Sequence, residues 1–350
     1  MTFEQATNVL TSALDAGLFS AATAEVGSAR GPTWTYASGR LSFVPGATVV
    51  AAHTIFDLAS LTKVLATATL GVKLAAAGRL DLEAPISSLI MPWNKPDRAA
   101  VTVRDLFEHS SGLPAHRCYF EHRAGRPAYE AAIAAEPLEY RPREKSLYSD
   151  LGFILLGFIL EDAGGASLDR QFHDWRTEEG ISDPIDFLPP LDWRSRIPLT
   201  GHDRWRGAIQ PGDVHDENTA ALGGIAGHAG LFGTAAAVGR IARWWLARLL
   251  GLAQEGDAAV ARAFVIRSSV PGSSRALGWD TMLTTSSCGE RWSERAIGHT
   301  GFTGTSLWID PPRDCYAVLL TNYVLRSTGR DKIRQVRRAF HDAVVADTTR

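Results

Sequence analysis

Two polar side chains, Ser60 and Lys63, interrupt the apolar stretch Phe56–Leu70. They are three residues apart, so on a helix they lie on the same face. A serine hydroxyl is a weak nucleophile until a base removes its proton, and a buried lysine can be that base, whereas an arginine stays protonated. Free backbone N–H groups at a helix start can also bind a developing oxyanion. The pair indicates nucleophilic catalysis, but a capping serine and a solvated lysine have the same spacing.

Two further motifs supply candidate partners for this pair. The tripeptide Tyr148–Asp150 (Tyr-Ser-Asp) stands where a buried helix is expected to begin, and His299–Gly301 (His-Thr-Gly) stands at the end of an expected strand. A glycine at the last position leaves room for a substrate against the strand edge. Each motif alone is as typical of a loop as of an active site.

Together, in this order, Ser-x-x-Lys, Tyr-x-Asp and His-Thr-Gly resemble the motifs of the serine β-lactamase and penicillin-binding-protein superfamily. The resemblance is to its class C β-lactamase-like branch, which is related to D-alanyl-D-alanine carboxypeptidases, to penicillin-binding proteins of the 4B type and to family VIII-like esterases. It extends over about residues 1–345. The stretches that carry it are residues 54–67, 78–87, 101–114, 148–157, 212–235 and 298–311.

The resemblance implies a fold and a set of roles. The fold would be α+β, of the β-lactamase/transpeptidase-like type, with helices from both chain ends flanking an antiparallel sheet beside a mainly helical domain. Ser60 would attack a carbonyl and form an acyl-enzyme, while Lys63 and Tyr148 would share the general-base and general-acid steps. The backbone N–H groups of Ser60 and Phe302 would form the oxyanion hole.

The resemblance also implies that Asp150, His299, Thr300 and Gly301 contact the substrate. One of these positions departs from a common pattern, because many class C β-lactamases have lysine where this chain has His299. A lysine is a fixed positive charge that attracts a substrate carboxylate, whereas a histidine is mostly uncharged near neutral pH. This difference favours an esterase or amidase over an enzyme with a dedicated carboxylate site.

A second departure is Asp150, where the family commonly has asparagine. If Asp150 points into the site, its carboxylate should favour the protonated forms of Lys63 and His299. A protonated Lys63 cannot accept the serine proton, but it can stabilise a Tyr148 phenolate. The sequence therefore leaves open whether Lys63 or Tyr148 is the base.

The predicted function is that of a serine hydrolase, without cofactor or metal, that cleaves a small ester or amide through a Ser60 acyl-enzyme. Two alternatives remain. The first is a true β-lactamase or a D-alanyl-D-alanine carboxypeptidase. The second is a catalytically silent ligand-binding or sensor protein on the same scaffold, although binding alone does not need Lys63 and Tyr148 beside the serine.

The elements that must hold these residues follow from periodicity and turn residues. We expect helices over residues 3–18, 60–77, 101–114, 149–165, 234–252 and 328–346, and strands over residues 21–29, 31–41, 291–300, 305–311 and 315–322. Residues 181–233 are expected to be mostly loop. These elements predict a sheet domain from residues 1–62 and 275–350, a mainly helical domain from residues 63–274, and an active site at their interface.

Composition narrows the partners. With 350 residues, 45% of them hydrophobic, and a net charge of -2, the chain has the composition of an ordinary globular protein. It lacks the excess of positive charge that nucleic-acid binding usually requires. The apolar run over residues 151–160 is too short to span a bilayer, the N-terminal segment has no basic region typical of a signal peptide, and three distant cysteines predict no disulfides. We expect a cytoplasmic protein with a small-molecule ester, amide or β-lactam substrate and no nucleic-acid or membrane partner. Its oligomeric state is left open.

A glycine-rich stretch places His215, Asp216, Glu217 and His228 where they could line a cleft. Their spacing matches no metal-binding motif. Hydrogen bonds that shape the loop are the preferred interpretation, and contact with substrate is the second. Residues 109–112 (His-Ser-Ser-Gly) are likewise expected to form a structural turn rather than a second serine site.

Overall fold

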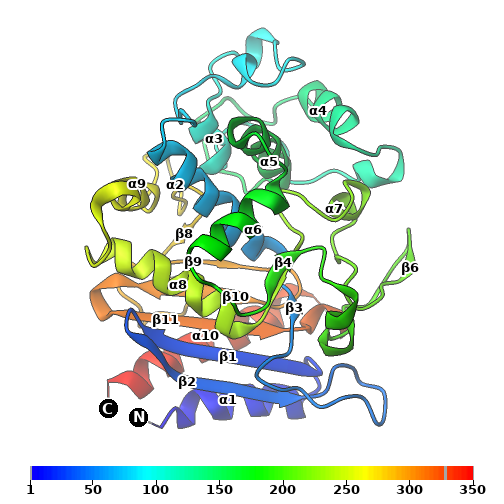
Figure 1. Ribbon diagram of the computed structural model, residues 1–350, viewed down its shortest axis with the longest axis vertical. Coiled ribbons are helices and arrows are strands. Elements are labelled where there is room, and N and C mark those ends of the chain that lie inside the picture. Colours follow the sequence, from blue (N-terminus) through cyan, green and yellow to red (C-terminus); the bar gives the residue numbers. More distant parts are fainter. Residues whose placement is uncertain (1, 327–328, 350) are drawn as a thin grey trace.

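A six-stranded antiparallel sheet forms the base of the molecule in the computed structural model, which describes residues 2–326 and 329–349 (Figure 1). Its order is β2-β1-β11-β10-β9-β8. The strands are β1 (Ala21–Ser28), β2 (Gly31–Gly39), β8 (Asp280–Thr281), β9 (Ile297–Thr300), β10 (Ser306–Asp310) and β11 (Cys315–Thr321). Because β1 pairs with β11, the two ends of the chain meet inside one sheet. The predicted α+β class and antiparallel sheet are confirmed.

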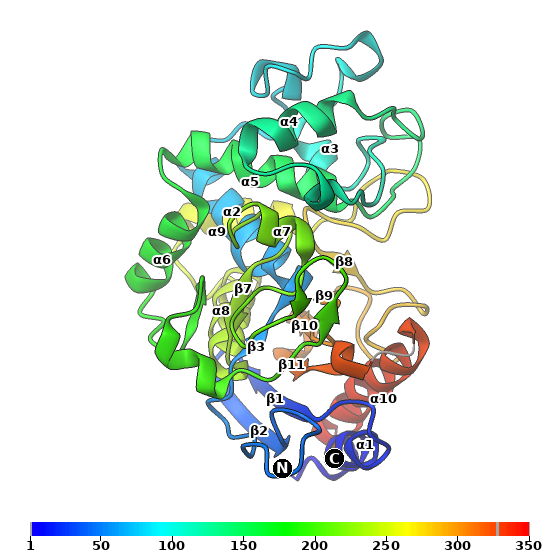
Figure 2. The same ribbon diagram turned by 90° about the vertical axis from the view of Figure 1, so that its right-hand side faces the viewer.

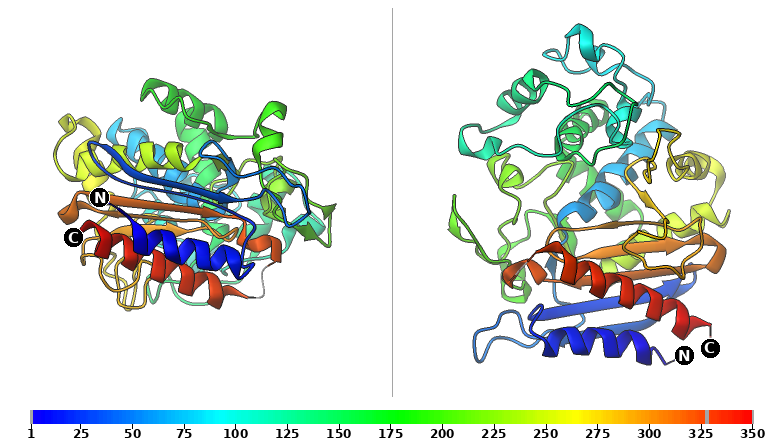
Figure 3. Two further views of the ribbon diagram at one scale, coloured as in Figure 1. Left: turned by 90° about the horizontal axis from the view of Figure 1, so that it is seen from below. Right: turned by 180° about the vertical axis from the view of Figure 1, so that it is seen from behind.

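Helices cover both faces of this sheet, because successive side chains of its central strands point to opposite sides and both sides are apolar. On β11, Ala317 and Leu319 belong to the core under α1 and α10, whereas Val318 and Leu320 belong to the core under α8. The covering helices are α1 (Glu4–Asp15), α8 (Ala235–Leu249) and α10 (Arg330–Thr348). Figure 3 shows α1 and α10 side by side on one face. α8 comes from the chain segment predicted to be helical domain, yet it packs on the sheet.

The other helices lie beyond α8, above the sheet in Figures 1 and 2. They are α2 (Thr69–Ala76), α3 (Val103–Phe107), α4 (Arg126–Ala135), α5 (Asp150–Gly164), α6 (Leu168–Glu178), α7 (Glu217–Ala221) and α9 (Glu255–Phe264). α5 is buried at every position from Leu151 to Leu160, and it begins at a Ser149 cap and ends at the left-handed Gly165. No single described helix is long and apolar enough to span a membrane; by length and composition only α5 with α6 passes, and this pair is bent by 67°.

The region predicted to be loop, residues 181–233, contains short strands as well as α7. Two of them complete a three-stranded sheet with a strand that ends just before Ser60, in the order β3-β7-β4. The short strands are β3 (Phe56–Asp57), β4 (Ile185–Phe187), β5 (His202–Asp203), β6 (Gly207–Ala208) and β7 (Leu231–Gly233). The short 3-10 turns outside the site are Ile86–Ser88, Pro96–Arg98, Tyr119–Glu121, Leu191–Arg196, Pro311–Arg313 and Tyr323–Arg326. This small sheet matters for function because it holds β3, the strand that leads into the turn carrying Ser60.

Several predicted elements have different bounds in the structure. The strand expected over residues 291–300 is limited to β9, because Trp292 is buried as an anchor against α10, where its indole N–H donates to the His341 carbonyl (3.0 Å). The C-terminal helix was predicted from Thr328, which lies outside the described residues, and α10 begins at Arg330. Single buried side chains outside a strand thus produced an alternating apolar pattern that predicted a longer strand.

Candidate active site

Ser60 lies in a strained turn between β3 and the helix that follows it. The turn is a 3-10 segment, Ala59–Leu61, and Ala59 has a φ of 47°, in the left-handed region that non-glycine residues rarely adopt. The carboxylate of Asp57 accepts hydrogen bonds from the Ala59 N–H (2.8 Å) and the His215 N–H (2.7 Å). Burial raises the pKa of Asp57 to about 6. Asp57 therefore holds the turn that presents Ser60.

The helix predicted over residues 60–77 is helical as far as Ala76 but not uniform. After the turn it continues as a π-helix, Lys63–Ala68, before α2 begins. Single π-helical turns are frequent at functional sites. Lys63 is the first residue of this segment, and its side chain is completely buried between the sheet and the helical layer.

The ammonium group of Lys63 donates three hydrogen bonds. They go to Ser60 Oγ (3.1 Å), to Asp150 Oδ1 (2.7 Å) and to the His228 carbonyl (3.1 Å). Burial by itself lowers the pKa of Lys63, but the charge of Asp150 and the neighbouring Tyr148 outweigh it, so the pKa is raised. Burial disfavours the Asp150 carboxylate, yet Lys63 holds the pKa of Asp150 far below its usual range. Asp150 therefore points into the site, and its carboxylate favours protonated Lys63, as expected for that case.

Tyr148 packs its ring among cationic and imidazole groups. The ring centroid lies 4.8 Å from Lys63 Nζ and 5.2 Å from the Arg275 guanidinium carbon, and its ring stacks obliquely on His109 and His299. Burial raises the pKa of Tyr148, and the charge of Lys63 partly offsets this. The phenol is therefore protonated in the resting site.

Backbone contacts at the start of α5 fix Tyr148 and Asp150. Ser149 Oγ donates to the Pro114 carbonyl (2.6 Å) and accepts from the Gly152 N–H (3.3 Å), while the Ser149 N–H donates to His109 Nδ1 (3.0 Å). His109 has a left-handed φ of 56° and is buried, and these contacts make it a support for Tyr148. The helix predicted over residues 101–114 is limited to α3, Val103–Phe107, because the left-handed backbone at His109 cannot continue it.

Burial, followed by the positive charges of Arg275 and Lys63, lowers the pKa of His299 well below its ordinary value. Asp150 favours the protonated form, as expected, but the other causes outweigh it, so the neutral imidazole is the favoured form. Nδ1 of His299 donates to the carbonyl of the half-buried Thr300 (2.8 Å). Nε2 is buried and has no hydrogen-bond partner among the described residues.

The turn after β9 packs directly on the Ser60 turn. A Cβ on Gly301 would lie 2.1 Å from Thr305 Oγ1 and 2.6 Å from the Leu58 carbonyl oxygen. Glycine is therefore needed here for packing, and not to leave room for substrate as the sequence suggested. Thr303 Oγ1 and Thr305 Oγ1 donate to the backbone carbonyls of Asp57 (2.8 Å) and Leu58 (3.1 Å).

Phe302 follows this glycine, and its side chain is 53% exposed and stacks on the His215 ring at 5.6 Å. The contacts of Gly301 and its neighbours thus bring the Phe302 backbone beside the turn of Ser60. Neither the Phe302 N–H nor the Ser60 N–H donates to a backbone carbonyl within the described part of the chain. Two free N–H donors beside one hydroxyl are what an oxyanion hole needs.

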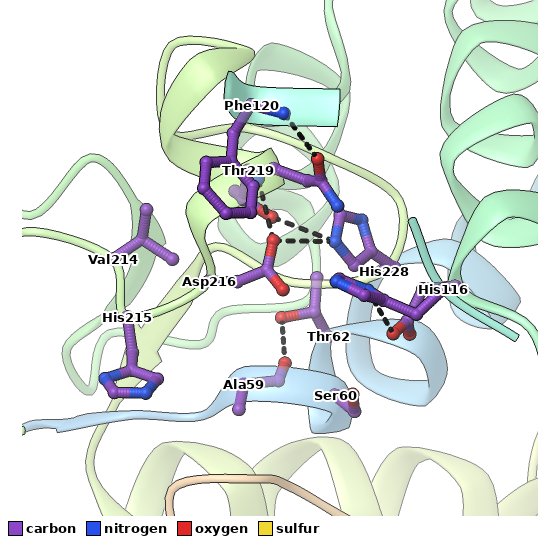
Figure 4. Close-up of polar contacts among 12 residues, drawn as sticks. Ala59, Ser60, Thr62, His116, Phe120, Val214, His215, Asp216, Thr219 and His228 are labelled. Carbon is purple, nitrogen blue, oxygen red and sulfur yellow. Dashed lines mark hydrogen bonds and ion pairs between the residues drawn. The ribbon is translucent and has the colours of Figure 1, made fainter. Parts of the chain in front are cut away.

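The His215–His228 stretch forms the opposite wall. Figure 4 shows Asp216 pointing to His228, whose Nε2 lies 2.9 Å from Asp216 Oδ1 and 3.2 Å from Thr219 Oγ1. Burial works against the Asp216 carboxylate, but His228 keeps the pKa of Asp216 well below its usual range. This network holds the His228 carbonyl against Lys63, so the predicted loop-shaping role is supported. Among the described residues, no group of three or more His, Cys, Asp or Glu side chains is placed to hold a metal ion.

Two residues at the site were missed by sequence reasoning. His116 Nδ1 lies 3.8 Å from Asp150 Oδ2, and this neighbouring carboxylate raises the pKa of His116. Arg275 lies over Tyr148, and its guanidinium has no hydrogen-bond or ion-pair partner in the described part of the chain. Neither residue belongs to a recognisable motif, so no sequence signal distinguished them from other surface residues.

Comparison with known proteins identifies the family. Residues 22–340 match the family described as Beta-lactamase. A relative from Escherichia coli (strain K12), named as a provisional D-alanyl-D-alanine carboxypeptidase, is 30% identical over 308 residues, with 77% of this chain and 69% of the relative covered. The chain belongs to the β-lactamase family and is a serine hydrolase of that family.

Solved structures agree on the fold. EstCE1, described as a hydrolase with promiscuous acyltransferase activity, matches with a TM-score of 0.75 and 18% identity over 97% of this chain and 98% of its own. A class C β-lactamase from Rhodobacter sphaeroides matches with a TM-score of 0.75 and 18% identity over 98% of this chain and 99% of its own. The β-lactamase/transpeptidase-like fold predicted from the motifs is confirmed.

Proposed function

We propose that this chain hydrolyses a small ester or amide through an acyl-enzyme on Ser60. The observation that carries the proposal is the hydrogen bond of 3.1 Å between Lys63 Nζ and Ser60 Oγ, with the same ammonium held 2.7 Å from Asp150. A serine that only capped a helix would not need a buried lysine within hydrogen-bond distance, so this geometry favours a catalytic role for the pair. The family assignment supports a small-molecule substrate.

The reaction starts when the Lys63–Tyr148 pair loses one proton. Because Asp150 raises the pKa of Lys63, the ammonium is the form that persists, and the deprotonated group is the Tyr148 phenolate beside it. The phenolate takes the proton from Ser60 Oγ as this oxygen attacks the substrate carbonyl. The oxyanion accepts hydrogen bonds from the N–H groups of Ser60 and Phe302.

Collapse of this intermediate breaks the bond to the leaving alcohol or amine, which takes the proton back from Tyr148. Water then attacks the acyl-enzyme and gives one proton to the same phenolate. As the acid leaves, Tyr148 returns this proton to Ser60 Oγ, which restores both groups. The cycle consumes one water and needs no cofactor or metal. The pH requirement follows directly, since turnover must rise with pH until the Lys63–Tyr148 pair has lost its proton.

The uncharged His299 supports a substrate without an obligatory carboxylate, because an imidazole held neutral offers no fixed charge at the strand edge. One observation favours a second candidate, a β-lactamase or D-alanyl-D-alanine carboxypeptidase. The guanidinium of Arg275, at 5.2 Å from the Tyr148 ring, has no acid partner among the described residues and could receive a substrate carboxylate.

A substrate panel on the wild type and on Ser60→Ala tests the proposal. It comprises p-nitrophenyl esters, D-amino-acid amides and nitrocefin. We expect ester turnover in the wild type that is lost in Ser60→Ala. Nitrocefin turnover far above ester turnover would favour the second candidate. Binding without turnover of any compound would favour a catalytically silent binding protein.

A further inference from the structure

A second buried cation lies behind the oxyanion-hole turn and has no part in the chemistry described so far. Arg337 is on α10, which crosses the face of the sheet that is turned to the viewer in the right-hand view of Figure 3. Its side chain is buried, and no carboxylate lies within ion-pair distance among the described residues. Its Nη2 donates to the carbonyl oxygens of Gly301 (2.6 Å) and Thr305 (2.9 Å). Burial lowers the pKa of Arg337 to about 9, so the guanidinium is charged at neutral pH.

An unpaired buried charge is costly, and a neutral side chain of similar size would pack there more cheaply. Nε of Arg337 even lacks a hydrogen-bond partner among the described residues. The nearby buried polar residue His341 has its Nε2 2.9 Å from Ser306 Oγ, and its pKa is lowered to about 3, so it brings no compensating charge. The site therefore keeps a net positive charge directly behind the β9–β10 turn.

The carbonyl that Arg337 contacts belongs to the peptide unit whose other end is the Phe302 N–H. A strong hydrogen bond at a peptide oxygen polarises the unit and makes its N–H a better donor. The peptide that bears the Ser60 N–H has a matching contact, since Thr62 Oγ1 donates to the Ala59 carbonyl at 2.6 Å. Both expected oxyanion donors thus belong to peptides whose oxygens accept a short hydrogen bond from a buried side chain.

We propose that Arg337 is a positioning residue that fixes the Gly301–Phe302 peptide and polarises it toward the oxyanion. The inference rests on the proposed function, because it requires an acyl-enzyme whose carbonyl oxygen lies in this hole. It assigns to a cation outside the substrate pocket a share of the transition-state stabilisation. A purely structural clamp would need the two hydrogen bonds but not the charge.

The test compares Arg337→Met, Arg337→Gln and Arg337→Lys with Arg334→Met as the matched control. Arg334 is one turn earlier on α10 and exposed, and it donates to the Thr285 carbonyl (2.7 Å) away from the site. For each variant, kcat and KM for a p-nitrophenyl ester are measured, with the infrared carbonyl stretch of the trapped acyl-enzyme. This stretch moves to lower wavenumber as the oxyanion-hole hydrogen bonds become stronger.

We expect Arg337→Met to lower kcat by about tenfold, less than the loss of a whole oxyanion donor, with KM little changed. Its acyl carbonyl stretch should move to higher wavenumber. Arg337→Gln should resemble Arg337→Met, Arg337→Lys should recover part of both effects, and Arg334→Met should match the wild type. If Arg337→Met does not fold, the pair Arg337→Gln and Arg337→Lys decides by the same two readouts.

An unchanged carbonyl stretch and kcat in folded Arg337→Gln or Arg337→Met would overturn the inference while leaving the proposed function intact, provided the wild type acylates at Ser60. Equal losses in Arg337→Gln and Arg337→Lys, without a shift of the stretch, would also overturn it in favour of a structural clamp. If the wild type forms no acyl-enzyme at Ser60, the proposed function fails, and the inference fails with it.

Discussion

Lys63 and Arg337 are both buried cations close to Ser60, but their surroundings differ. The ammonium of Lys63 forms an ion pair with Asp150 at 2.7 Å, so its charge is largely cancelled within the site. Among the described residues, the guanidinium of Arg337 donates hydrogen bonds only to backbone carbonyls, so no carboxylate cancels its charge. The paired cation lies where a proton must move, whereas the unpaired cation lies behind the place where negative charge develops.

The comparison of Lys63 with Arg337 indicates that a buried positive charge can have two different roles in this fold. A carboxylate partner raises the pKa of a lysine and ties its proton to the state of a neighbouring tyrosine. Arginine keeps its proton at neutral pH even though burial lowers the pKa of Arg337 to about 9, so this side chain acts as a fixed positive charge. Removing each group should therefore give a different kinetic signature.

The largest effect is expected at the proton-transfer pair. Lys63→Ala and Tyr148→Phe should each lower kcat/KM by about a thousandfold, because each removes part of the general-base machinery. Steady-state ester hydrolysis measures this, with Lys73→Ala as a matched control, since Lys73 is a partly exposed lysine on α2 paired with Asp257. Near-native acylation by Tyr148→Phe would contradict the assignment of the phenolate as base.

Asp150→Asn should act on both stability and the pH profile. It leaves Lys63 buried without a counter-ion, which costs about 3–5 kcal/mol of the free energy of unfolding. The pKa of Asp150 is depressed in the fold, so its stabilisation is present above the unfolded value of about 3.9 and is lost as pH falls below it. Urea unfolding of the wild type and the variant should therefore differ most at neutral pH and converge in acid.

Asp150→Asn should also shift the pH dependence of kcat/KM. Because Asp150 raises the pKa of Lys63, its removal should shift the rising limb of kcat/KM to lower pH. The wild type assayed over the same pH range is the control. A limb that stays in place would show that Asp150 does not govern the proton of the Lys63–Tyr148 pair.

Asp57→Asn should have a smaller and pH-dependent effect. Burial raises the pKa of Asp57 to about 6, so the folded state holds this proton more tightly than the unfolded chain and the wild type loses stability as pH rises toward 6. Asp57→Asn has no titrating carboxyl, so it lacks this loss of stability. Its side chain has one acceptor oxygen for the N–H groups of Ala59 and His215, so the Ser60 turn should be less well held and acylation should slow several-fold. Unfolding and acylation, each measured below and above pH 6, check both statements. A variant whose stability relative to the wild type does not change with pH would contradict them.

The smallest effect is expected for Arg275→Ala. If its guanidinium receives a substrate carboxylate, nitrocefin turnover should fall about two- to fivefold, as for a solvent-accessible ion pair, while neutral ester turnover stays unchanged. The ratio of the two kcat/KM values is the measurement. Equal changes for both substrates would remove the support for a carboxylate subsite.

The sequence carried the parts of this account that depend on local pattern. The apolar run of α5, the two strand-like runs of β1 and β2, and the three motifs predicted the fold and placed Ser60, Lys63, Tyr148 and Asp150 in one site. These signals lie within short segments, where periodicity and caps act directly. The structure supports this grouping, while the catalytic roles of these residues stay predictions.

Features that depend on burial by distant segments could not be predicted. The sequence predicted a mostly uncharged His299, but the strong lowering of its pKa follows from burial and from Arg275, which belongs to another segment. The need for glycine at position 301 follows from the Leu58 carbonyl, and the role of Arg337 follows from helix α10 crossing behind the sheet. Each is a tertiary contact between segments that share no motif.

The central claim is that Ser60 becomes acylated. Incubation of the wild type and Ser60→Ala with an active-site-directed fluorophosphonate, followed by peptide mass mapping, tests it most directly. The account predicts a single adduct on the peptide that contains Ser60 in the wild type and none in Ser60→Ala. Labelling of another residue, equal labelling of both proteins, or no labelling of the wild type would contradict it.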